Sequence, residues 1–98
     1  MKTIWLVTAE ILVKPGVMPS GSTKGFVNIT TWADSIETIR EKLSGYLESL
    51  RWHLISIEKA QPIDESQDYE DEIEDMLERT RSNPDAIILG TFHSYKEN

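Results

Sequence analysis

The segment DSIETIREKLSGYLESL, residues 34–50, predicts the helix around which the rest of the chain is organised. Its apolar residues recur at steps of three and four, so they share one helical face: Ile36, Ile39, Leu43, Leu47 and Leu50. Asp34 and Glu37 have the spacing of a capping box at the start of this helix. Gly45 lies inside the pattern, where it costs about 1 kcal/mol relative to alanine, and indicates close packing or an early end.

Strand patterns surround this helix. Two strands are predicted before the helix, at residues 3–13 and 25–32. A third strand (51–60), a second helix (68–82) and a last strand (85–95) are predicted after it. The second helix has its own apolar face, formed by Tyr69, Ile73, Met76, Leu77 and Thr80. The segment 14–24, rich in glycine and proline, joins the first two strands.

The element order is therefore β-β-α-β-α-β. Strand–helix–strand units favour parallel neighbours with right-handed crossovers, whereas the first two strands form an antiparallel pair. We expect an α/β (α+β) fold, a single domain over residues 1–98 with a four-stranded mixed sheet and both helices packed against it. A ferredoxin-like sandwich, with the order β-α-β-β-α-β, is the second choice.

Composition excludes several classes of function. The 98 residues contain no cysteine, which rules out disulfides and thiolate zinc sites. The longest apolar stretch, residues 4–13, is interrupted by Glu10 and is too short to span a bilayer, so we expect a cytoplasmic protein without membrane contact. A net charge of −7 with scattered basic residues argues against nucleic acid as a partner.

The negative charge is concentrated in one segment. Nine of the fifteen residues in 64–78 (DESQDYEDEIEDMLE) are acidic and none is basic, so the other residues of the chain sum to +2. Carboxylates near a helix start are favourable because the free amides make that end positive. This accounts for Asp68, Glu70 and Asp71. It leaves three further carboxylates without an explanation: Glu74, Asp75 and Glu78.

This excess charge has two interpretations. Like-charge pairs four residues apart, such as Glu70 with Glu74, each cost about 0.2–0.5 kcal/mol, so the helix is more negative than its own stability favours. The cluster is either a solvated face that prevents association or a docking surface for a basic protein partner. The predicted partner-binding residues are Asp64, Glu65, Glu70, Asp71, Glu74, Asp75 and Glu78.

Spacing argues against a metal or phosphate site. Asp64, Ser66, Asp68 and Glu70 stand at alternate positions, as ligands do at the start of a calcium-binding loop. The pattern then fails, because Tyr69 stands where glycine is required and Asp75 stands where a bidentate glutamate is expected. The segment 16–23 (GVMPSGST) lacks the lysine of a phosphate loop after its second glycine and leads into a strand. No metal and no cofactor is therefore predicted.

The case for an enzyme rests on two histidines. His53 and His93 both lie in predicted strands, and if these strands share a sheet the imidazoles could approach each other for zinc binding or acid–base chemistry. No paired-histidine spacing and no nucleophile motif supports this, so no catalytic residue is predicted. A small-molecule or enzymatic pocket under the loop 14–24, with His53 or His93 as its polar group, is the alternative hypothesis.

The remaining predictions concern association. The three tryptophans, Trp5, Trp32 and Trp52, are expected in the core. A four-stranded open sheet has two edges, and small proteins often cover one by forming a homodimer. The sequence thus favours a small acidic protein-binding module, for example an immunity-type or inhibitor protein that engages a basic partner. A structural or oligomeric domain is a further alternative.

Overall fold

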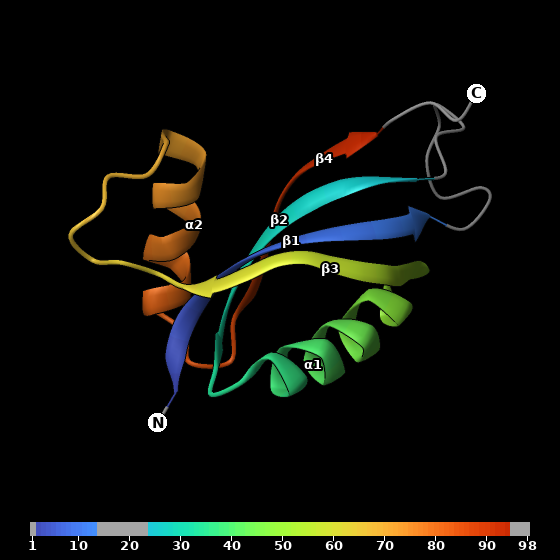
Figure 1. Cartoon of the computed structure of the whole chain (residues 1–98), viewed down its shortest axis with the longest axis horizontal. Coiled ribbons are helices and arrows are strands. Elements are labelled where there is room, and N and C mark those ends of the chain that lie inside the picture. Colours follow the sequence, from blue (N-terminus) through green and yellow to red (C-terminus); the bar gives the residue numbers. More distant parts are fainter. Residues whose placement is uncertain (1, 14–23, 95–98) are drawn as a thin grey trace.

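Four strands form one sheet in this computed structural model, which describes residues 2–13 and 24–94. The strands are β1 (Thr3–Val13), β2 (Lys24–Ala33), β3 (Trp52–Pro62) and β4 (Ile87–Ser94). Helix α1 (Ile36–Ser49) connects β2 to β3, and helix α2 (Asp71–Arg81) connects β3 to β4. The predicted element order and the α+β fold are confirmed (Figure 1).

The direction of the strands differs from the mixed sheet that we expected. The strand order is β3-β1-β2-β4, and each of the three adjacent pairs is antiparallel. β2 and β3 run the same way across the α1 connection, but β1 lies between them and pairs with both. A connecting helix places two strands in one sheet, but it does not determine whether another strand separates them. β3 and β4 are consequently the two edges.

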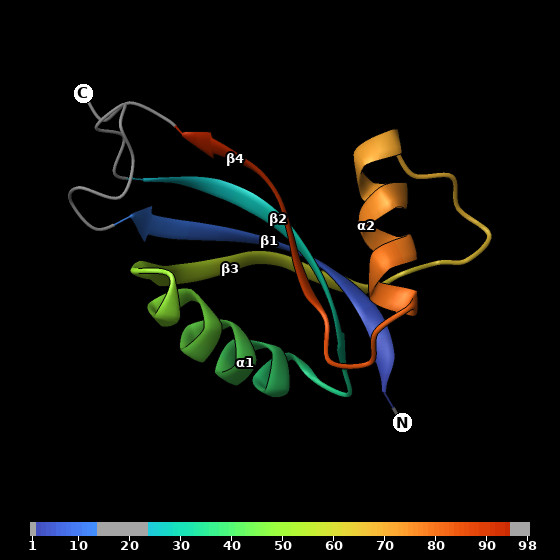
Figure 2. The same ribbon diagram turned by 180° about the vertical axis from the view of Figure 1, so that it is seen from behind.

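The helices cover opposite faces of the sheet (Figures 1 and 2). Side chains of a strand alternate between the two faces. The odd-numbered residues of β1 from Val7 to Val13 are buried with Ile39, Leu43 and Leu47 of α1. Ile4, with the opposite parity, is buried with the apolar residues of α2. The domain therefore has two hydrophobic clusters, one on each face.

The capping box predicted Asp34 as the N-cap of α1, but the helix begins one residue later, at Ile36. Ser35 is the N-cap, and its hydroxyl accepts a hydrogen bond from the Thr38 amide at 3.2 Å. Asp34 instead accepts from the Thr38 hydroxyl at 2.8 Å, which lowers the pKa of that carboxyl. Gly45 is exposed and the helix continues past it to Ser49, so this glycine marks neither close packing nor an early end.

The three tryptophans are half-buried and pack against the two clusters, but none is fully enclosed. Trp5 and Trp52 pack against the cluster beneath α1, and Trp32 packs against the cluster beneath α2. The Trp5 indole donates to the Ala33 carbonyl at 3.1 Å, which ties β1 to the end of β2. Trp52 on β3 and Phe92 on β4 approach with ring centroids 5.8 Å apart, so residues from the two edge strands meet on the α1 face.

Candidate protein-binding surface

Helix α2 is attached to the sheet by the inner face that the sequence predicted. Ile73, Met76, Leu77 and Thr80 are buried, and Tyr69 is half-buried beside them. All seven predicted partner-binding residues lie elsewhere, on the exposed surface of α2 and of the loop before it. The spacing of the apolar residues therefore decides which carboxylates face outward.

Polar contacts fix the position of α2 on β2. The Thr80 hydroxyl donates to the Met76 carbonyl at 2.8 Å and lies 2.7 Å from the Thr30 hydroxyl on β2. The Trp32 indole donates to the Thr80 carbonyl at 2.7 Å. Buried hydroxyl and indole groups are costly unless they are bonded, and these contacts satisfy them. The outer face of α2 is thus presented on a firmly held helix.

The loop before α2 is folded onto itself and onto the helix. The Asp64 carboxylate accepts from the Ser66 hydroxyl at 2.6 Å and from the Ser66 amide at 2.9 Å, which lowers the pKa of Asp64. The Tyr69 hydroxyl accepts from the Asp64 amide at 3.0 Å. Glu65 forms an ion pair of 2.9 Å with Arg81 at the far end of α2. Loop and helix therefore present their carboxylates together.

Two further predicted carboxylates also have partners. Glu74 accepts from the Tyr69 amide at 3.2 Å, near the start of the helix. Asp75 forms an exposed ion pair of 3.2 Å with Arg79, one turn further along. Exposed pairs of this kind contribute about 0–1 kcal/mol, so a ligand can replace the Arg79 contact at little cost.

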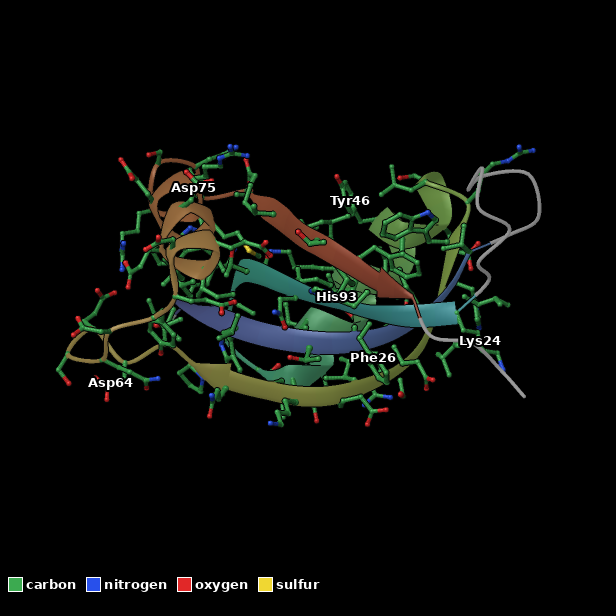
Figure 3. All side chains as sticks on the ribbon, turned by 90° about the horizontal axis from the view of Figure 1, so that it is seen from above. Lys24, Phe26, Tyr46, Asp64, Asp75 and His93 are labelled. Carbon is green, nitrogen blue, oxygen red and sulfur yellow. The ribbon has the colours of Figure 1, made fainter. Side chains whose placement is uncertain are left out.

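Three predicted carboxylates form no hydrogen bond or ion pair with the described part of the chain: Glu70, Asp71 and Glu78. Glu70 is the N-cap of α2, but its side chain makes no capping contact. We use the name acidic surface for the seven predicted residues together. Figure 3 shows its extent, from Asp64 on the loop to Asp75 on α2, at one end of the sheet.

The charge of the protein coincides with this surface. Residues 64–81 contain nine acidic residues and two arginines, a net charge of −7, which equals the net charge of the whole chain. The remaining residues contain eight acidic and eight basic residues. A strongly negative end on an otherwise balanced molecule produces a directional field rather than a diffuse one.

Glu72 belongs to the same acidic segment but has a different role, which sequence reasoning missed. Its carboxylate accepts from the Thr91 amide at 3.0 Å and from the Thr91 hydroxyl at 2.8 Å, joining α2 to β4. The amide bond, and then the hydroxyl bond, lower the pKa of Glu72. Glu72 lies four residues before Met76, at the border of the apolar face, and this spacing was the available signal.

The Thr91 amide is available to Glu72 because the pairing of β4 with β2 is irregular there. Val27 faces Phe92 and Ile29 faces Leu89, so two residues of β4 lie opposite the single residue Asn28. This arrangement is a β-bulge, which leaves an extra residue outside the regular ladder.

The two histidines do not approach each other. His53 lies on β3 and His93 on β4, and the two central strands separate them. His53 is exposed and contacts Glu48 at 3.1 Å. The two strands share one sheet, but they form its opposite edges, and no hydrogen bond or ion pair joins the two imidazoles among the described residues.

The remaining sequence hypotheses concern a pocket under the loop 14–24, a metal site and membrane contact. Most of the loop 14–24, under which a pocket was considered, lies outside the described residues. Within residues 2–13 and 24–94, no three His, Asp or Glu side chains are placed to hold a metal ion. Neither α1 nor α2 has the length and apolar character needed to cross a membrane.

Comparison with known proteins gives no family assignment. The sequence matches no family model, and neither the curated proteins nor the solved structures include a match to the chain.

Proposed function

We propose that the chain is a protein-binding module whose acidic surface docks a basic protein. The observation that supports this most directly is the charge distribution: the net charge of −7 lies within residues 64–81, and the rest of the chain is balanced. The carboxylates of Glu70, Asp71 and Glu78 have no partner among the described residues, so their charges are available to a ligand.

Such a surface mainly affects the rate at which the two proteins meet. A one-sided field attracts an oppositely charged protein over about a Debye length, close to 8 Å at physiological salt, and raises the association rate. The buried contacts of Thr80 and Trp32 hold α2 in place, so little ordering is needed on binding. An inhibitor of a basic toxin or nuclease is one concrete form of this function.

A set of neutralised variants tests the proposal. Glu70→Gln, Asp71→Asn and Glu78→Gln together remove three charges from groups that have no structural partner. The immobilised protein is used to capture binders from its source lysate at low and high salt. We expect a basic protein that is retained by the unaltered chain at low salt, released at high salt and lost from the triple variant.

The matched control removes equal charge elsewhere, through Glu37→Gln, Glu41→Gln and Glu58→Gln on exposed positions of α1 and β3. This variant should retain the captured protein. Equal loss in both variants would show that total charge, not the acidic surface, is responsible. Absence of any salt-sensitive basic partner would leave the acidic surface as a solvated face and overturn the proposal.

A further inference from the structure

The two edges of the sheet are protected to different degrees. β3 carries Glu58 and Lys59, ends at Pro62 and has two irregularities in its pairing with β1. Charges, proline and bulges are the features that prevent an edge from pairing with another strand. β4 has no Asp, Glu, Lys or Arg between Ile87 and Ser94, and it has one bulge. By these criteria β4 is the edge left open to an added strand.

The side chains of β4 also suit a further strand. Ile87, Ile88, Leu89 and Phe92 are half-buried, although residues of these types are usually more fully covered in a paired strand. Figure 3 shows β4 along one margin of the sheet, and no described strand pairs with its outer side. An edge strand presents unpaired amide and carbonyl groups along that side, although the Thr91 amide of β4 is bonded to Glu72.

The charge next to β4 indicates what would pair there. Glu72 joins α2 to Thr91 of β4, and Asp75 lies one turn further on the same side of the helix. The acidic surface therefore borders the open edge. Pairing of β4 with a second copy would bring no opposite charge to the acidic surface, because β4 contains no lysine or arginine between Ile87 and Ser94. A basic strand would bring that charge.

We infer that β4 receives an extended basic segment of the partner as a fifth strand, while its lysine or arginine side chains contact the acidic surface. This inference rests on the proposed function, since it specifies how the basic partner binds. Backbone hydrogen bonds to the edge contribute affinity in this mode of recognition, and side chains contribute specificity. In the homodimer through a sheet edge, a second copy of the chain would pair with β4 in place of the basic segment.

A pair of peptides tests the inference. The probe is a capped peptide of alternating lysine and valine, matched to the 8 residues of β4. Its control has the same composition with D-lysine at every lysine position, which retains the charge but prevents regular strand pairing. Each is titrated into labelled protein at low ionic strength, with amide chemical shifts and amide hydrogen exchange as readouts. Sedimentation of the free protein at the same concentration gives its oligomeric state.

We expect the all-L peptide to bind about tenfold or more tightly than its control, which corresponds to the loss of one or two net hydrogen bonds. Amide exchange should slow in residues 87–93, and the triple neutralised variant should bind both peptides more weakly.

Two outcomes overturn strand addition while leaving the proposed function intact. One is equal affinity for both peptides with shift changes confined to α2, which indicates docking by charge alone. The other is no binding of the all-L peptide by a protein that still captures a basic partner through its acidic surface. A dimer that the all-L peptide does not dissociate would assign β4 to a second copy instead.

Discussion

Gly45 occupies an exposed position of α1 where nothing lies within 4 Å of an added Cβ. Glycine in a helix interior loses more backbone entropy on folding than alanine does. We expect Gly45→Ala to raise the free energy of unfolding by about 0.5–1 kcal/mol. The change is measured as a shift of the urea midpoint at constant slope.

Gly25 provides the opposite case at the same scale. A Cβ at Gly25 would lie 2.5 Å from the His93 carbonyl oxygen and 2.7 Å from the Phe92 ring, so Gly25→Ala should destabilise the pairing of β2 with β4.

The prediction for Gly45 has its own contradicting outcome. A Gly45→Ala variant that is less stable than the unaltered protein would show that α1 requires glycine at this position for a reason other than the space around its Cα.

At the scale of elements, the contact between α2 and β4 should depend on pH. The pKa of Glu72 is lowered from its ordinary value of 4.5, first by the Thr91 amide. A carboxyl whose pKa is lower in the folded than in the unfolded state contributes stability that is complete above the unfolded value and lost as the pH falls through the folded one. We expect Glu72→Gln to reduce the loss of stability below about pH 4.5, measured by urea unfolding across an acid series.

The control for this prediction is Glu78→Gln, which removes a carboxylate without a described partner. Its acid dependence should stay closer to that of the unaltered protein. Thr91→Val removes the hydroxyl donor but not the amide, so it should have a partial effect. Identical acid profiles for the Glu72→Gln variant and the unaltered protein would contradict a stabilising role for this carboxylate.

Sequence reasoning predicted the elements better than their ends. The spacing of Ile73, Met76, Leu77 and Thr80 identified the buried face of α2, because helical periodicity is a local property. The cap of α1 was assigned to Asp34 although Ser35 forms it, since adjacent polar residues can both bond to the first turn. The role of Glu72 depends on Thr91, a residue that only the tertiary fold brings near.

At the scale of the whole molecule, the order of the strands in the sheet could not be predicted from the sequence. Hydrophobic alternation showed that 3–13 is a strand with apolar residues on both sides, and the structure covers its two ends with helices on opposite faces. Nothing local indicated that β1 would separate β2 from β3, and the placement of His53 and His93 on opposite edge strands follows from that arrangement. The exposure of the seven predicted carboxylates could be inferred; their function stays a proposal.

The two separate hydrophobic clusters have a consequence for the order in which the chain folds. Residues 3–62, with β1, β2, α1 and β3, contain every fully buried residue of the cluster beneath α1. This part can assemble before α2 and β4 are available, for example while synthesis continues. In the native protein, α2 and β4 should then open as one unit at a lower free energy than the centre of the sheet.

Native-state hydrogen exchange in low denaturant tests this order of opening. Amides of Ile73 to Leu89 should exchange together, ahead of those of Val7 and Ile29. A single global unfolding event for all of them would show instead that the two faces form one cooperative unit. If the expected order holds, the element that carries the charge is also the one that is completed last and released first.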